Sequence, residues 1–269
     1  MVNEASTAAR GQAGTGAIAC PRYPYPMRAV LLVHPTSLDT IDEVVRCQPD
    51  AFLLDVAGCE PKVLLTLVGA IRTRERPVLL RIRPLADGGA GDLSCAMQAR
   101  PDAVWLRDTA GPAQVEQLAS RVAVAEAELD LPDRGTRIVA SIESARGALA
   151  LARLAEVGQR LAAIALDAQA LAADLRCRPE EPGLLPAPVR ATQAQAVIVA
   201  AASNVPAIDA TQTPSPPEEF AAEAAGAVAN GFSGKLALDP AQVAALRRSD
   251  PQPPFGRWME NFVSGVATK

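Results

Sequence analysis

The sequence has few cysteines, and none of them forms the close pair that a zinc site uses. The five cysteines are odd in number and widely spaced, and no C-x-x-C motif is present. This pattern excludes both a disulfide framework and a zinc site. We therefore expect reduced thiols and a cytoplasmic protein. The cysteines are Cys20, Cys47, Cys59, Cys95 and Cys177.

Long apolar runs and basic runs are missing as well. No stretch approaches the roughly 18 to 20 uninterrupted apolar residues of a membrane span, and the first residues lack the pattern of an export signal. The net charge is −4 and the basic residues are scattered, so neither a membrane nor a nucleic acid is an expected partner. Arginine far outnumbers lysine and alanine is abundant, which is typical of a GC-rich bacterial genome.

An alternation of short apolar runs and longer helical segments fills most of the chain. Eight such units follow one another, as expected for parallel strands that are covered on both faces. Their number and total length predict a (β/α)8 TIM barrel over residues 27–248, with tails at 1–26 and 249–269. An open doubly wound sheet is the rival, but its Gly-rich nucleotide loops are missing. The expected strands cover residues 28–34, 51–56, 77–83, 102–108, 137–143, 161–167, 205–209 and 234–239.

Charged or polar residues stand at the end of every expected strand. Active sites of such barrels lie at the carboxyl ends of the strands. Charged side chains are seldom buried without a partner, so we expect a polar mouth that contains ion pairs. The residues are His34, Asp55, Arg81, Arg83, Arg107, Asp108, Glu143, Asp167, Asp209 and Asp239.

Four motifs resemble the citrate lyase β-subunit family of the HpcH/HpaI aldolase superfamily. They are IVASIESARGALALARLA, LAADL, VPAID and GFSGKLALDPAQV, and they occur in the order of that family within about residues 28–245. The resemblance implies a modified barrel that often forms trimers and binds Mg²⁺. It also implies the making or breaking of a carbon–carbon bond between an acyl thioester, on CoA or a carrier protein, and a 2-oxo acid. Such chemistry needs positive charge where an enolate develops.

The resemblance assigns roles to some residues of this chain, whereas at other positions the functional residue of the family is replaced. Glu143 matches a metal-binding glutamate, and Arg81 matches a substrate-binding arginine. Asp55 matches the first acid of a motif whose later acids are replaced here. The second metal-binding aspartate of the family is replaced by Ala170, so the implied magnesium site lacks a ligand.

Several of these residues have more than one interpretation. Asp167 either supplies the missing metal ligand or caps the helix that follows it. Glu143 is a metal ligand, a general base, or the partner of Arg81 or another arginine at the mouth. His34, the one histidine, either transfers protons or bonds a loop carbonyl.

The expected site therefore combines six residues. Arg81, Glu143 and His34 are the catalytic candidates, and a metal would be held by Glu143 and Asp167. Arg81 would also bind a substrate carboxylate or phosphate, because its planar fork matches these groups. Asp55 and Asp209 are the further substrate-binding candidates.

Three functions fit this pattern. The first is a divergent citrate lyase-like enzyme that cleaves or forms a carbon–carbon bond through an enolate. The second is a metal-independent barrel enzyme of specialised metabolism that performs a cyclisation, isomerisation or decarboxylation. The third is a non-catalytic binding subunit, since one fold hosts many functions. The two enzymes predict a small-molecule substrate, and the binding subunit predicts a bound ligand or partner. The resemblance adds a homo-oligomer, by family habit a trimer.

Overall fold

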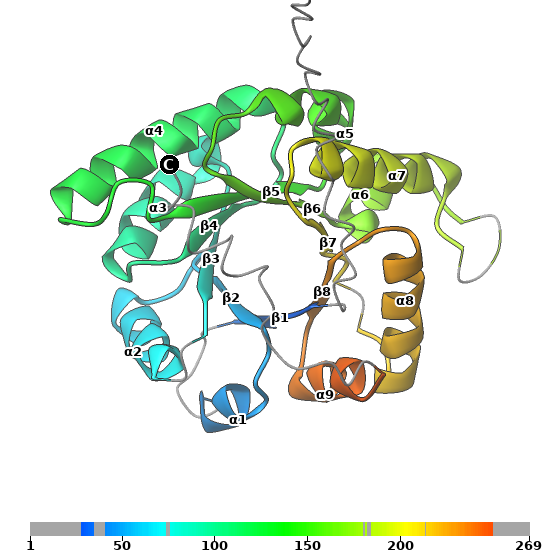
Figure 1. Cartoon of the computed structure of the whole chain (residues 1–269), viewed down its shortest axis with the longest axis horizontal. Helices are drawn as coiled ribbons and strands as arrows, with labels where there is room; N and C mark the ends of the chain where they lie inside the picture. The colour runs from blue at the N-terminus through cyan, green and yellow to red at the C-terminus, as the bar shows by residue number, and fades with distance from the viewer. Residues whose placement is uncertain are drawn as a thin grey trace, which may run out of the picture.

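Eight parallel strands close into a barrel in the computed structural model, which describes residues 28–34, 41–73, 76–179, 181, 184–212 and 214–249 (Figure 1). The strands follow chain order around the ring, and β1 pairs with β8 to close it. This confirms the predicted (β/α)8 fold. The predicted tails lie outside the described residues, except for Ser249, which ends the last described helix. The strands are β1 (Arg28–Val33), β2 (Ala51–Asp55), β3 (Val78–Ile82), β4 (Ala103–Leu106), β5 (Arg137–Ile142), β6 (Leu161–Leu166), β7 (Ala207–Asp209) and β8 (Gly234–Ala237).

Helices surround the ring of strands and connect them (Figure 1). Two helices, α6 and α7, connect β6 to β7. No helix within the described ranges is both long and apolar enough to cross a membrane. The α-helices are α1 (Ile41–Arg46), α2 (Pro61–Arg72), α3 (Gly89–Gln98), α4 (Pro112–Glu128), α5 (Ala145–Ala150), α6 (Ala168–Asp174), α7 (Ala187–Ala202), α8 (Pro217–Ala229) and α9 (Pro240–Ser249), and the 3-10 helices are η1 (Leu85–Asp87) and η2 (Leu151–Glu156).

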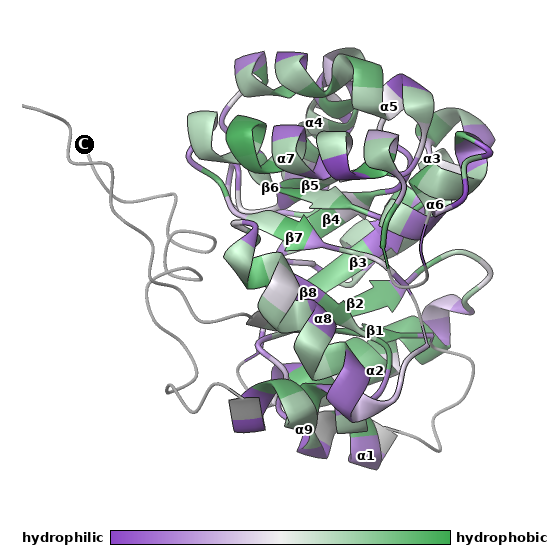
Figure 2. Cartoon of the chain, turned by 90° about the vertical axis from the view of Figure 1, so that its right-hand side faces the viewer, coloured by the Kyte–Doolittle hydropathy of each residue, from purple (hydrophilic) through white to green (hydrophobic). Residues whose placement is uncertain are grey.

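Two apolar layers share the strands between them. Successive side chains of a strand point to opposite faces, so alternate residues enter the barrel and the others meet the helices. Leu53, Leu79 and Trp105 belong to the inner layer, whereas Leu54 and Leu80 belong to the outer one. The strands are accordingly apolar on both faces, and they are mostly green in Figure 2. This alternation decides which residues reach the mouth of the barrel.

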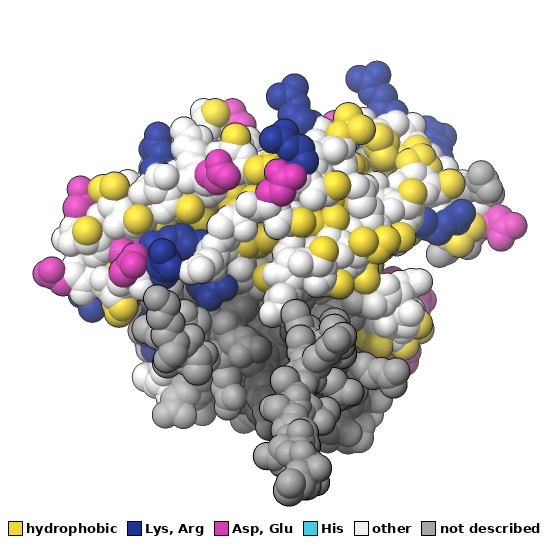
Figure 3. Space-filling view, turned by 45° about the horizontal axis from the view of Figure 1, so that its top comes forward, with side chains coloured by type: hydrophobic (Ala, Val, Ile, Leu, Met, Phe, Trp, Pro, Cys, Tyr) yellow, Lys and Arg dark blue, Asp and Glu magenta, His cyan; other side chains and the backbone are white. Residues whose placement is uncertain are grey.

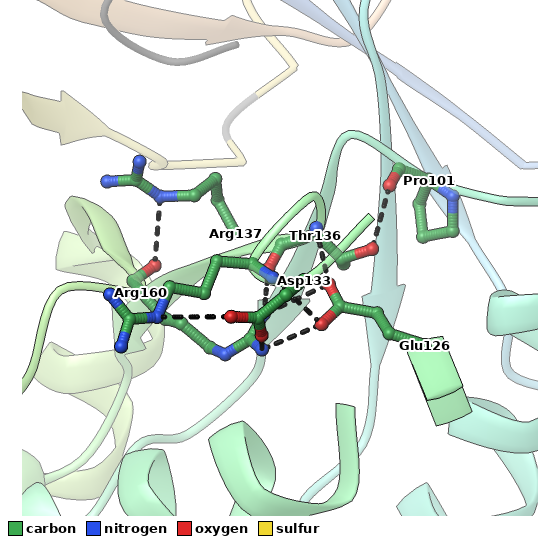
Figure 4. Close-up of polar contacts among 7 residues, drawn as sticks. Pro101, Glu126, Asp133, Thr136, Arg137 and Arg160 are labelled. Carbon is green, nitrogen blue, oxygen red and sulfur yellow. Dashed lines mark hydrogen bonds and ion pairs between the residues drawn. The ribbon is translucent and has the colours of Figure 1, made fainter. Parts of the chain in front are cut away.

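A buried ion pair closes the opposite, amino-terminal end of the barrel (Figure 4). Arg160 precedes β6 and donates from Nη1 and Nη2 to the two oxygens of Glu126 on α4, at 3.0 and 2.7 Å. Glu126 also accepts the backbone N–H groups of Arg134 and Thr136, at 3.1 and 2.7 Å. Arg160 donates further to the carbonyl oxygen of Thr136 at 3.0 Å. The network joins α4 to the starts of β5 and β6.

Substitution of Glu126 by Ala tests the structural weight of this network. Glu126 is 1% exposed, so its removal leaves a buried guanidinium without its main counter-charge. We expect a loss of about 3 to 5 kcal/mol in the free energy of unfolding, measured by urea denaturation. Glu128→Ala, at an exposed position of the same helix, is the control and should change stability by less than about 0.5 kcal/mol. A similar small change in both variants would contradict the structural role.

Candidate active site at the carboxyl end of the barrel

Side chains from six neighbouring strands converge on the mouth of the barrel. Alternate residues of each strand face the interior of the barrel. Each of these side chains continues the inward-facing set of its own strand, so it is directed to the barrel axis. The register supports this arrangement, because Asp55 and Arg81 are direct partners on β2 and β3. The six residues are His34, Asp55, Arg81, Arg107, Glu143 and Asp167.

Arg81 is held almost completely buried beside Asp55. Its Nη2 donates to Oδ2 of Asp55 at 2.6 Å, and the Arg81 side chain is 4% exposed. The Nε atom of Arg81 is buried and has no hydrogen-bond partner within the described residues. A buried donor without a partner is costly, so an acceptor oxygen of a ligand beside Nε would be stabilising.

Glu143 is held by two neighbours from opposite sides. Its Oε1 accepts from the hydroxyl of Ser141 at 2.9 Å. Its Oε2 accepts from Nη2 and Nε of Arg107, at 3.0 and 3.3 Å. The arginine that pairs with Glu143 is thus the one on the neighbouring strand, not Arg81.

The sequence places Arg107 at a strand end, as one of the arginines that could pair with Glu143, and assigns it no catalytic or binding role. The available signal was its spacing on β4, where Ala103 and Trp105 face inward. Burial lowers the pKa of the Arg107 guanidinium, but the charge and hydrogen bonds of Glu143 raise it by more. The charges of Asp55 and Asp167 act in the same direction. Arg107 therefore contacts Glu143 and also interacts electrostatically with two further carboxylates of the mouth.

Asp167 caps helix α6, which is one of its two expected roles. Its Oδ1 accepts the backbone N–H groups of Gln169 and Ala170, both at 3.0 Å, and its Oδ2 accepts from the amide of Gln212 at 3.1 Å. Its own N–H donates to the carbonyl oxygen of Ile142 at 3.0 Å, which places Asp167 beside Glu143. Burial raises the pKa of the Asp167 carboxyl, and the charge of Glu143 adds to this shift.

His34 and Asp209 lie differently from the buried residues of the mouth. His34 follows β1 at an inward position and its side chain is exposed. Asp209 alternates with the inward-facing Ile208, so it points to the outer layer.

In the outer layer, Asp209 forms a buried ion pair with Lys235 that includes no residue of the mouth. Its Oδ2 accepts from Nζ of Lys235 at 2.7 Å, and the same Nζ lies 5.5 Å from the ring centroid of Phe220 on α8. Asp209 and Lys235 line a cavity of about 370 Å³ outside the barrel wall, next to α8. The structure brings five of the six predicted site residues to the mouth and separates Asp209 from them.

The side chains of the mouth do not fit a magnesium ion in this arrangement. Both oxygens of Glu143 and of Asp167 already accept hydrogen bonds. A dication on Glu143 would also meet the guanidinium of Arg107 at short range. Within the described ranges, no three His, Cys, Asp or Glu side chains gather to hold a metal. Mg²⁺ needs several oxygen ligands at short, regular distances.

The family model for HpcH/HpaI aldolase/citrate lyase proteins matches residues 28–240. The chain belongs to this family. Membership makes it an enzyme of the aldolase and citrate lyase type, and it confirms the resemblance stated from the four motifs. No protein with a curated description matches this chain in sequence.

Solved structures of similar fold come from several organisms. RipC from Yersinia pestis is 24% identical, with a TM-score of 0.62 over 82% of this chain and 94% of that one. CitE from Mycobacterium tuberculosis, in complex with magnesium, acetoacetate and coenzyme A, is 21% identical, with a TM-score of 0.63 over 85% and 82% of the two chains. Malate synthase of Haloferax volcanii, in its magnesium and glyoxylate complex, is 16% identical, with a TM-score of 0.72 over 86% and 77%. These likenesses show the shared barrel.

The pKa of Asp167 gives a prediction for stability against pH. A carboxyl whose pKa is raised on folding stabilises the folded state below its unfolded pKa, and this contribution is lost as the pH rises through the folded value. Asp167→Asn has no such titration, so the free energy of unfolding of the wild type should fall relative to the variant as the pH rises above the ordinary aspartate value of about 4. Urea denaturation at a series of pH values measures this difference. A difference that does not change with pH would contradict the raised pKa.

Proposed function

We propose that this enzyme makes or breaks a carbon–carbon bond next to the carbonyl group of a small 2-oxo acid or acyl thioester, through an enolate. The observation that carries the proposal is the arrangement of Arg81, Arg107 and Glu143 in one mouth. Two guanidinium groups and one carboxylate are what enolate formation requires, because negative charge develops on an oxygen while a proton moves at carbon. Solved relatives of the fold support the class of substrate, since they hold acetoacetate with coenzyme A, oxaloacetate, and glyoxylate.

Arg81 is the proposed substrate-binding residue. Asp55 fixes one end of its guanidinium, and the unpaired Nε donor remains for an oxygen of the substrate. An arginine held in this way binds a carboxylate with fixed geometry, which a lysine does not reproduce. Asp55 contributes to substrate binding by positioning Arg81.

Glu143 is the proposed general base of the condensing direction. Ser141 and Arg107 orient its carboxylate toward the mouth from two sides. In cleavage, the same group in its protonated form gives its proton to the enolate carbon, while the proton of the substrate hydroxyl leaves to water. His34, exposed at the rim, is the proposed carrier of protons between the site and water. Asp209 has no part in this proposed site because it pairs with Lys235 behind the barrel wall.

A second candidate function is favoured by the hydrogen bonds of the carboxylates. Because the oxygens of Glu143 and Asp167 are held by Arg107, Ser141, Gln212 and backbone N–H groups, the site is arranged for acid/base work without a metal. An isomerisation, cyclisation or decarboxylation in specialised metabolism would use the same residues. Turnover of a 2-oxo acid without change in its carbon skeleton would favour this candidate.

Substrate screening with matched variants tests the first candidate. Oxaloacetate, acetoacetate and glyoxylate are each incubated with the full chain, with and without acetyl-CoA, and products are followed by NMR. We expect cleavage or condensation of at least one pair. Glu143→Gln should lower kcat/KM by about 10²-fold or more, because it removes the base. Arg81→Lys should raise KM, since it removes the planar fork.

The control for these variants is Arg121→Ala, at an exposed position of α4, which should keep the activity of the wild type. Equal activity of Glu143→Gln and the wild type would exclude the proposed role of Glu143. Absence of any carbon–carbon product would remove the first candidate.

We also propose that the enzyme is a cytoplasmic homo-oligomer, a trimer by family resemblance. Apolar side chains lie across the face that α4, α5 and α7 form (Figure 3). Leu149, Ile198 and Val124 on these helices are 87%, 67% and 58% exposed, and contiguous exposed apolar side chains often mark interfaces. The four described cysteines are thiols, which is consistent with a reducing compartment.

The oligomer can be tested by light scattering coupled to size-exclusion chromatography. The wild type should elute with three times the chain mass, and Leu149→Glu should shift it toward the monomer because a charge would enter the interface. A monomeric wild type would contradict the proposal.

A further inference from the structure

We infer that the guanidinium of Arg107 takes the place of a divalent cation at the mouth of the barrel. The positive charge that an enolate needs is then built into the chain and is not supplied by a bound metal. The charge arrangement stands on geometry alone, while its catalytic meaning rests on the proposed function.

The contacts of Arg107 place its charge on the carboxylate that a metal would use. Nε and Nη2 of Arg107 both donate to the same oxygen of Glu143, at 3.3 and 3.0 Å. The side chain is 38% exposed, so its neighbours cover Arg107 only in part. Within the described residues these bonds occupy Nε and Nη2 and leave Nη1 for a ligand oxygen.

The surrounding charges explain why the guanidinium stays there. Asp55, Glu143 and Asp167 come from β2, the end of β5 and the end of β6, and all three interact electrostatically with Arg107. A guanidinium keeps its charge over the whole range in which carboxyl groups titrate, so it offsets part of the negative charge of these three acids throughout that range. A divalent cation could approach Glu143 only by breaking two charge-assisted hydrogen bonds against a positive charge.

The exchange has a consequence for the substrate. An arginine brings a single charge and hydrogen-bond donors, whereas a divalent metal brings two charges and direct coordination. The arginine therefore stabilises an enolate less strongly. We expect substrates whose enolate is already stabilised by a thioester or by a second carbonyl group, rather than simple ketones.

Binding of Mn²⁺ is the test, because it needs no knowledge of the substrate. The full chain is treated with EDTA and desalted, and free Mn²⁺ is then followed by electron paramagnetic resonance during titration. The wild type should show no saturable site. Arg107→Ala removes the charge and frees the Glu143 oxygen, so it should bind one Mn²⁺ per chain at least about tenfold more tightly than the wild type.

Three further variants make the result specific. Arg107→Ala combined with Glu143→Gln should lose the new site, because the carboxylate is gone. Arg107→Lys keeps a positive charge and should resemble the wild type. Arg83→Ala is the matched control: it also removes a strand-end arginine and frees a carboxylate, that of Asp92, whose distance to Arg83 is 2.8 Å, and it should create no site.

Two results would overturn the inference. The first is a wild type that binds one Mn²⁺ per chain and loses it on Glu143→Gln, a comparison that does not depend on the folding of Arg107→Ala. The second is a folded Arg107→Ala protein that gains no site. Either result leaves the carbon–carbon chemistry untouched, whereas a failed substrate screen leaves the Mn²⁺ measurements valid, so the two failures are distinguishable.

Discussion

Closure of the parallel barrel is the constraint on which the site depends. Once β1 pairs with β8, every strand has a neighbour on both sides, and alternate side chains have only the interior of the ring to occupy. Apolar residues such as Leu53, Leu79 and Trp105 fill that interior. The side chains at the next inward positions, at the strand ends, therefore lie close to one another. Ionisable side chains at these positions must form pairs or lose their charge.

The ion pairs at the mouth form between residues of adjacent strands. Asp55 and Arg81 are register partners on β2 and β3, and Arg107 and Glu143 follow the ends of the adjacent strands β4 and β5. Each of these two acids therefore meets the arginine of an adjacent strand, Asp55 that of the following strand and Glu143 that of the preceding one. Asp167 has no arginine beside it in this sequence of strands, and it uses the N–H groups of α6 and the amide of Gln212.

Much of the fold could be predicted because the strands are apolar on both faces and recur with helices between them. The placement of Arg81, Glu143 and Asp167 at the barrel mouth could also be predicted, since the sequence shows where the apolar strands end. The orientation of Asp209 did not follow. Strand β7 has only three residues, Ala207–Asp209, and apolar residues on both sides of the acid give no sign of which face it joins. Its buried partner Lys235 comes from the neighbouring strand β8, where the two residues are register partners, and the sequence does not show this pairing.

Arg107 shows a different limit of the sequence. Its inward spacing was readable, but its role depends on the balance of charge among four strands, and no local pattern encodes such a balance. The loss of an aspartate at Ala170 and the presence of an arginine at 107 are separate in the sequence. In the barrel, Arg107 pairs with Glu143, whereas Ala170 donates its backbone N–H to Asp167, the neighbour of Glu143.

The two ends of the barrel differ in how far their buried charged groups are hydrogen-bonded. At the amino-terminal end, Glu126 accepts four hydrogen bonds from Arg160, Arg134 and Thr136, so the network is complete within the protein. At the carboxyl end, the buried Nε of Arg81 has no partner among the described residues, and Arg107 remains partly exposed. A complete network gains nothing from a ligand, whereas unmet donors are stabilised by one. The mouth is therefore the end of the barrel where binding energy is available, and the unmet group of Arg81 is a donor, which an anionic oxygen satisfies.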